Sequence, residues 1–134
     1  MLKKTITFTD YNGEKRTEDF YFNLTKAEVT EMELEISGGM RAMLEKIIAA
    51  QDTPSLVKVF KDLILRAYGE KSADGKHFFK EDKDGHKLVN LFVQTEAYSE
   101  LFMELATNAD AASEFINAIF PADIVEKAKE LEAK

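Results

Sequence analysis

The stretch TFTDYNGEKRTEDFYFNLTKAEV, residues 7–29, decides the fold because it changes from strand chemistry to helix chemistry within a few residues. Threonines alternate with apolar side chains over residues 5–9, and a period of two is typical of a half-buried strand. The pair Asn12-Gly13 follows, and it is a strong hairpin signal because both residue types tolerate positive φ. We therefore predict a β-hairpin over about residues 3–22.

Helix chemistry begins at Thr25, which forms the Thr-x-x-Glu pattern of a capping box with Glu28. Apolar residues then recur at helical spacing along most of the remaining chain. Proline or a capping residue precedes several of these segments, and glycine or proline follows them. The predicted helices cover about residues 25–36, 40–51, 54–68, 87–106, 108–119 and 123–131. Residues 94–96 either kink the fourth of them or start a new helix, and either Asn108 or Asp110 opens the fifth.

Residues 69–86 are polar and punctuated by glycine, which favours a long loop, with a short hairpin around residues 77–79 as an alternative. Gly69 is expected to end the preceding helix. The sequence thus predicts a predominantly helical α+β fold, in which an N-terminal β-hairpin is followed by five to six helices. We expect one domain over residues 1–134, divided into the hairpin (about 3–22) and a helical body (about 25–133).

Composition restricts the function. The 134 residues include no cysteine, which excludes disulfides, thiol catalysis and thiolate metal sites. The formal net charge of −7 disfavours nucleic acid as a partner, because phosphate contacts need clustered Lys and Arg. The apolar runs are too short to span a bilayer, and the N-terminus lacks the apolar region of a signal peptide. We expect a soluble intracellular protein that binds neither nucleic acid nor membrane.

Catalytic motifs are missing from the sequence, whose two histidines, His77 and His86, both lie in the polar stretch 69–86. Part of that stretch follows EF-hand spacing, with Asp74 and Gly75 in place and a glutamate at the twelfth position. However, its first position is Glu70 rather than Asp, so an ordinary polar connection is the better interpretation. We predict no enzymatic activity, no cofactor and no metal site.

A partner surface is the remaining candidate site. Met32, Met40 and Met43 lie on the apolar side of two predicted helices, and methionine is over-used at adaptable binding surfaces. Phe20 and Phe22 end the hairpin, whose strands offer an edge to a partner. Packing in the core explains all five residues as well, and for methionine it is the commoner use. The hypothesis is that these five residues border a partner-binding surface.

Several segments resemble small proteins encoded in the tail-gene clusters of tailed phages and prophages. They are KTITFTDYNGEKRTEDFYFNLTKAEV, EMELEISGGM, KIIAAQD, VFKDLILRAYGEKSADGKHF and QTEAYSELFMELATNADAASEFINAIFP. The resemblance covers about residues 3–121 and is to the family of tail assembly chaperones, which is identified by overall pattern and has no catalytic motif.

The resemblance implies a mostly helical, non-enzymatic protein that acts in the host cytoplasm and is not retained in the mature virion. Such proteins bind the tape measure protein before the tail tube polymerises, and help to recruit the major tail protein, the subunit of that tube. Self-association into a homo-oligomer would suit the coating of a long client by multivalency. Two alternatives remain: a virion structural protein, such as a head–tail completion or tail tube component, and an acidic regulator of a host protein.

Overall fold

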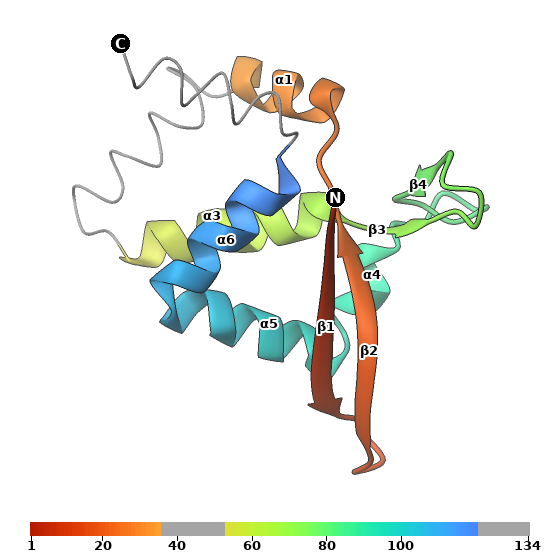
Figure 1. Ribbon diagram of the computed structural model, residues 1–134, viewed down its shortest axis with the longest axis vertical. Coiled ribbons are helices and arrows are strands. Elements are labelled where there is room, and N and C mark those ends of the chain that lie inside the picture. Colours follow the sequence, from red (N-terminus) through yellow and green to blue (C-terminus); the bar gives the residue numbers. More distant parts are fainter. Residues whose placement is uncertain (36–52, 121–134) are drawn as a thin grey trace.

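The computed structural model describes residues 1–35 and 53–120 of the chain (Figure 1). Met40, Met43 and the helices predicted over residues 40–51 and 123–131 lie outside the described residues. The elements, in chain order, are β1 (Leu2–Thr9), β2 (Lys15–Phe22), α1 (Lys26–Glu35), α3 (Thr53–Ala67), β3 (Tyr68–Lys71), β4 (Phe78–Phe79), α4 (Val89–Phe92), α5 (Glu96–Thr107) and α6 (Ala109–Ile119).

The fold class differs from the prediction. The four strands form one antiparallel sheet in the order β1-β2-β3-β4, and the described residues contain five helices, of which α4 has only four residues. The expectation of a predominantly helical chain with one hairpin followed by five to six helices is therefore wrong, and the fold is mixed α+β. In Figure 1, α3, α5 and α6 lie on one side of the β1–β2 hairpin, and β3 and β4 extend on the other.

The additional strands come from the stretch that the sequence presented as a long loop. Tyr68 and Gly69 of β3 pair with the end of β2, and β3 then pairs with β4. The pairing gives hydrogen-bond partners to the outer edge of β2, which would otherwise be exposed. Gly69 therefore does not cap α3: the helix ends at Ala67, and Gly69 lies in a strand. The alternative of a short hairpin around residues 77–79 is confirmed.

The β1–β2 hairpin was predicted correctly, and its two faces differ in chemistry. Ile6 and Phe8 are buried on the face that packs against the helices. On the opposite face, the hydroxyls of Thr7 and Thr17 are 3.0 Å apart, and the Thr5 hydroxyl donates to the Asp19 carboxylate. One face therefore builds the core while the other is hydrated, as expected for an antiparallel pair.

The hairpin turn depends on one aspartate. The Asp10 carboxylate accepts hydrogen bonds from the backbone N–H groups of Asn12 and Glu14, both at 2.9 Å, and pairs with Arg16 at 2.7 Å. These bonds favour the ionised form, so the pKa of Asp10 lies below its usual value, with the Arg16 hydrogen bond as the largest cause. Gly13 adopts φ of 83°, which a residue with a Cβ rarely does.

The helix starts were the most predictable part of the chain. The capping box is confirmed: Glu28 N–H donates to Thr25 Oγ1 at 3.1 Å, and Thr25 N–H donates to Glu28 Oε1 at 3.0 Å. The helix predicted over residues 87–106 is divided into α4 and α5, with the break at the anticipated place. Asn108 caps α6 by accepting from the N–H of Ala111 at 3.1 Å.

The core lies between the hairpin and the helices and is rich in aromatic rings. Phe92 of the short helix α4 is at its centre, with ring centroids 5.0 Å from Phe20, 5.8 Å from Phe22 and 4.5 Å from Tyr68, on which it stacks. Phe22 also contacts the ring of Phe115 of α6. Offset and edge-to-face aromatic pairs stabilise beyond the area that they bury. The sheet is thereby fixed to α4 and α6 through the end of β2.

Candidate functional site

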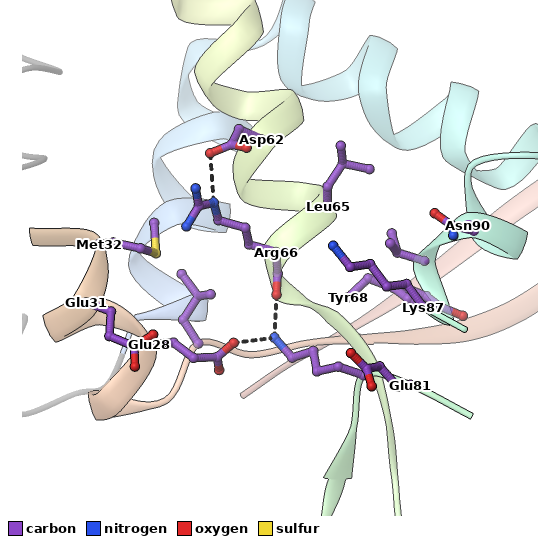
Figure 2. Close-up of a pocket in the computed structure, with 13 residues that line it drawn as sticks. Glu28, Glu31, Met32, Asp62, Leu65, Arg66, Tyr68, Glu81, Lys87 and Asn90 are labelled. Atoms are coloured by element: carbon purple, nitrogen blue, oxygen red, sulfur yellow. Dashed lines mark hydrogen bonds and ion pairs between the residues drawn. The ribbon is translucent and has the colours of Figure 1, made fainter. Parts of the chain in front are cut away.

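A groove of about 490 Å³ lies between α1, α3 and the chain that leads from β4 into α4 (Figure 2). We name it the α1–α3 groove. Its apolar lining comes from α1, α3, β3, α4 and Leu24, which lies between β2 and α1. Charged side chains from α1, α3 and the segment 80–87 surround that lining. The lining residues are Leu24, Glu28, Glu31, Met32, Asp62, Leu65, Arg66, Tyr68, Lys80, Glu81, Lys87, Val89 and Asn90.

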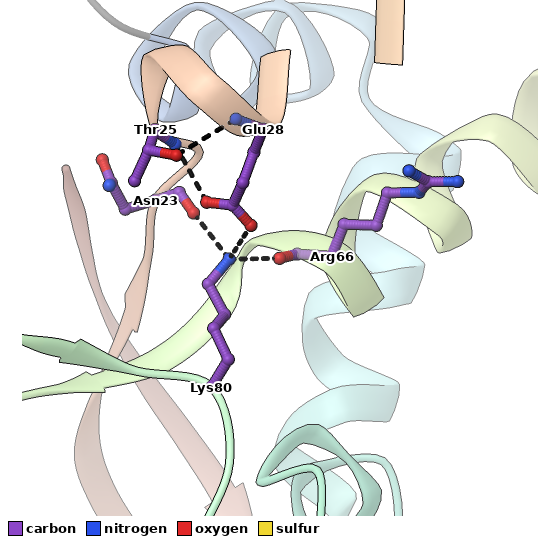
Figure 3. Close-up of polar contacts among 5 residues, drawn as sticks. All are labelled: Asn23, Thr25, Glu28, Arg66 and Lys80. Atoms are coloured by element: carbon purple, nitrogen blue, oxygen red, sulfur yellow. Dashed lines mark hydrogen bonds and ion pairs between the residues drawn. The ribbon is translucent and has the colours of Figure 1, made fainter. Parts of the chain in front are cut away.

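Lys80 is the central polar residue of the groove. Its ammonium group donates to the backbone carbonyl of Asn23 at 3.0 Å and to Glu28 Oε2 at 3.1 Å, and it also donates to the backbone carbonyl of Arg66 (Figure 3). Asn23 directly follows β2, Glu28 lies in α1 and Arg66 lies in the last turn of α3. A cation is favourable at the last turn of a helix, where carbonyl groups lack intrahelical partners. Lys80 therefore ties three elements together.

The position of Lys80 depends on a close approach of two strands. An added Cβ at Gly69 would lie 2.3 Å from the ring of Phe78 and 2.6 Å from the carbonyl oxygen of Phe79, so only glycine fits there. The Phe78 ring in turn lies 5.6 Å from the Lys80 ammonium, within the range of a cation–π contact. Gly69 thus lets β4 pack closely on β3, and β4 delivers Lys80 to the junction.

The other charged residues of the groove fall into two sets. Arg66 pairs with Asp62 at 2.9 Å and with Glu35 of α1 at 3.7 Å. Glu31, Glu81 and Lys87 are exposed and, within residues 1–35 and 53–120, their side chains have no hydrogen bond or ion pair. The groove therefore combines an apolar lining, an internally paired set of charges and a rim of free charges, a composition suited to an amphipathic partner.

Burial changes the protonation equilibrium of Lys80. Desolvation lowers its pKa below the usual value of 10.5, and the hydrogen bond and charge of Glu28 offset only part of this effect. A lysine with a lowered pKa in the folded state binds fewer protons there than in the unfolded chain, once the pH exceeds the folded-state pKa. Its contribution to stability therefore rises with pH, up to the unfolded-state pKa near 10.5.

We predict that the free energy of unfolding of the wild type rises relative to that of Lys80→Met as pH increases from neutrality toward 10.5. Urea unfolding followed by circular dichroism at a series of pH values measures the difference directly. Taking the difference between the two proteins removes the titration of the other lysines and the tyrosines. A difference that is independent of pH, or that falls with pH, would contradict the assigned environment of Lys80.

A second hollow of about 240 Å³ lies between α3 and α5 and is lined by Lys61, Tyr98, Ser99, Phe102 and Met103. Met103 is 57% exposed, so this surface presents apolar area without the surrounding charges of the α1–α3 groove. This hollow is smaller than the α1–α3 groove, and it is lined by fewer charged side chains.

Asp82, Asp84 and His86 are the group of side chains in the described residues that come close enough for a metal ion, with ligand atoms within 4.8 Å of one another. However, the Asp82 carboxylate already accepts from the N–H groups of Asp84 and His86, both at 2.9 Å. These are the same bonds that Asp10 makes at the β1–β2 turn. The cluster is thus accounted for as a turn cap.

The residues predicted for a partner surface occupy different places. Met32 lines the α1–α3 groove but is only 3% exposed, and Phe22 is fully buried in the aromatic core. Phe20 is half-buried and packs on Phe92. Met40 and Met43 lie outside the described residues. The structure therefore brings one of the five into the groove and two into the core that supports it, and their role in binding stays a prediction.

Sequence reasoning missed Lys80 and Arg66 altogether. Lys80 falls in the stretch interpreted as a polar connection, and its partners are distant in sequence, with Asn23 57 positions away. One local signal was available: Phe78 and Phe79 are two adjacent aromatic residues in a polar stretch, which indicates that the chain returns to the protein surface there.

Among the described helices, none combines the length and the apolar character needed to cross a bilayer. Compared with known protein families, the chain matches the model of the family described as phage tail assembly chaperone, over residues 1–134. No curated protein and no solved structure matches it.

Proposed function

This chain belongs to the family of phage tail assembly chaperones, and we propose that it binds helices of the tape measure protein in the α1–α3 groove, without catalysing a reaction. Binding would keep the apolar faces of this long client from aggregating until the tail tube forms around it. The chaperone would act in the host cytoplasm, recruit the major tail protein and leave before the virion is complete. The family membership supports a role in tail assembly, and the named partners are the proposal.

The composition of the groove carries this proposal. Helix-in-groove recognition needs a hydrophobic channel that accepts side chains at positions i, i+3 and i+4 of a partner helix. Leu65 offers partly exposed apolar surface here, Leu24 and Met32 form the buried floor beneath it, and the volume of about 490 Å³ can hold a few large side chains. Methionine adapts its shape to different neighbours, which suits a client with many unlike helices.

Charge at the rim would orient the client and keep the complex soluble. Glu31 and Glu81 stand on opposite sides of the groove without a partner in the described residues. Rim charges contribute to specificity and association rate more than to affinity. A client helix with Lys or Arg beside its apolar stripe would fit this rim.

The pairing of the inner charges supports binding rather than catalysis. Lys80 is held by Glu28 and two carbonyl groups, and Arg66 is held by carboxylates. A general acid or base must be free to exchange a proton with a substrate. These side chains instead fix the walls of the groove. We propose that Met32 supports the client-binding wall, that Phe20 and Phe22 support it from the core, and that Met40 and Met43 also take part in client binding.

We expect that co-expression with the tape measure protein of the same gene cluster turns that client from an insoluble into a soluble protein. The two proteins should co-elute with a defined stoichiometry in size-exclusion chromatography with light scattering. Expression of the tape measure protein alone provides the control. If the client precipitates in both cases, and the protein of this chain is found in purified virions by mass spectrometry, a virion structural role replaces the chaperone role.

A further inference from the structure

We infer that Lys80 is a positioning residue, which holds α1 against α3 and thereby forms one wall of the α1–α3 groove. The inference deepens the proposed function and rests on it for the consequence in client binding. The placement of α1 itself follows from contacts within the chain and can be measured without any client.

The apolar attachment of α1 is small. Of its ten residues, only Val29 and Met32 are buried, and both lie on the side that faces the core. Burial of two side chains contributes a few kcal/mol at most, and the entropy lost in ordering ten residues offsets it, so elements of this kind open locally at a low free-energy cost. The polar contacts of α1 therefore have a large share in keeping it in place.

Polar contacts at the start of α1 converge on Lys80. Glu28 uses its two carboxylate oxygens for different tasks: Oε1 accepts from Thr25 N–H and starts the helix, whereas Oε2 accepts from Lys80 (Figure 3). The Lys80 ammonium also binds the carbonyl that ends the strand before α1 and a carbonyl in the last turn of α3. One ammonium group thus connects the start of α1 to both neighbouring elements.

A second ion pair between α1 and α3, between Arg66 and Glu35, is weaker. Arg66 and Glu35 approach to 3.7 Å, and their side chains are 43% and 62% exposed. An exposed ion pair at this distance contributes little to stability. The Lys80 and Glu28 side chains are less exposed, at 28% and 34%, and their contact is short. Of these two contacts, the one made by Lys80 is therefore the one whose removal should loosen α1 more.

The test compares Lys80→Met with Lys87→Met. Both lysines line the groove and both changes remove one positive charge and keep an apolar stem, but Lys87 has no side-chain partner in the described residues. Amide hydrogen exchange of residues 26–35 is measured in the full chain without client. We expect exchange in Lys80→Met to be about tenfold faster or more, the size expected for loss of a charge-assisted hydrogen bond.

In Lys87→Met, exchange over residues 26–35 should equal that of the wild type, and the amides of α5 should keep the wild-type rate in both variants. Unchanged exchange of α1 in Lys80→Met would overturn the inference. Equal acceleration in α1 and α5 would also overturn it, because it would show general destabilisation instead of the release of one helix.

Client affinity adds the functional readout, with Lys15→Met as a control far from the groove. The affinity of Lys80→Met for the tape measure protein should fall about tenfold, in step with the release of α1.

Lys80→Arg keeps the charge, so it should partly restore the wild-type exchange rate of α1 and the wild-type affinity. Wild-type affinity in Lys80→Met, despite faster exchange, would overturn the role in client binding. If the wild type itself fails to bind the tape measure protein, the proposed function is wrong. The exchange rates of α1, which are measured without client, still test whether Lys80 holds α1 in place.

Discussion

Replacing Phe22 by alanine is expected to lower the free energy of unfolding by about 3–5 kcal/mol. Phe22 is fully buried at the end of β2, and its ring contacts Tyr68, Phe92 and Phe115. The change removes the ring through which β2 contacts β3, α4 and α6, and it leaves a cavity between the sheet and the helices. Because domains of this size are stable by about 5–15 kcal/mol in total, a large fraction of the protein should unfold in mild urea.

Tyr21→Ala is the matched control, since it removes the neighbouring aromatic ring from the other face of β2. Tyr21 is half-buried and pairs across the sheet with Lys3 and Gly69, so its loss should cost about 1 kcal/mol or less. Urea unfolding with an unchanged m-value measures both variants. If Phe22→Ala is as stable as Tyr21→Ala but loses the client, Phe22 acts in the partner surface, as the sequence first suggested, and not in the core.

The sequence predicted well the features that depend on neighbouring residues. The alternation before Asn12-Gly13 gave the hairpin, and the capping box at Thr25 gave the start of α1 within a residue. Asn108, one of the two residues predicted to open α6, is its cap for the same reason. A cap or a turn is satisfied by groups two to four positions away, so its signal is contained in a short window.

The features that depend on distant residues were missed. Strands β3 and β4 have only four and two residues, and they form because Tyr68 and Gly69 meet the edge of β2, far away in the sequence. Gly69 was interpreted as a helix end because glycine commonly occurs there. Its actual role, a close approach to Phe78, is invisible without the pairing of the two strands. The predominantly helical fold class was wrong for this reason.

The candidate site was predictable only in part. Methionine and aromatic content pointed to a binding surface, and Met32 does line the α1–α3 groove. The junction that shapes the groove joins Lys80 to Asn23, Glu28 and Arg66, which lie on separate elements. The periodicity of a single segment cannot predict such a junction, because the four residues do not lie on one face of one helix or strand.

Replacing Leu65 by glutamate is expected to weaken binding of the tape measure protein about 100-fold. Leu65 lies on α3, lines the groove and is only partly buried, so its side chain is available to a client. Glutamate forms helices nearly as well as leucine, which should preserve α3. In the complex, however, the new carboxylate would lie against apolar client side chains without a partner, and removing a charge from water costs several kcal/mol.

Met103→Glu is the control for this change. Met103 lies on α5, is 57% exposed and belongs to the second hollow rather than to the groove. The variant receives the same negative charge on an apolar position of a helix, so it reproduces any effect of net charge on the client. Its affinity should stay within about threefold of the wild type, as expected for a surface change remote from the interface.

The most direct measurement is therefore the affinity of the wild type, Leu65→Glu and Met103→Glu for the purified tape measure protein, by isothermal titration calorimetry, after urea unfolding has shown that all three are folded. We predict tight binding by the wild type and by Met103→Glu, and about 100-fold weaker binding by Leu65→Glu. Wild-type affinity in Leu65→Glu, or an equal loss in the two variants, would contradict the assignment of the α1–α3 groove as the client-binding site.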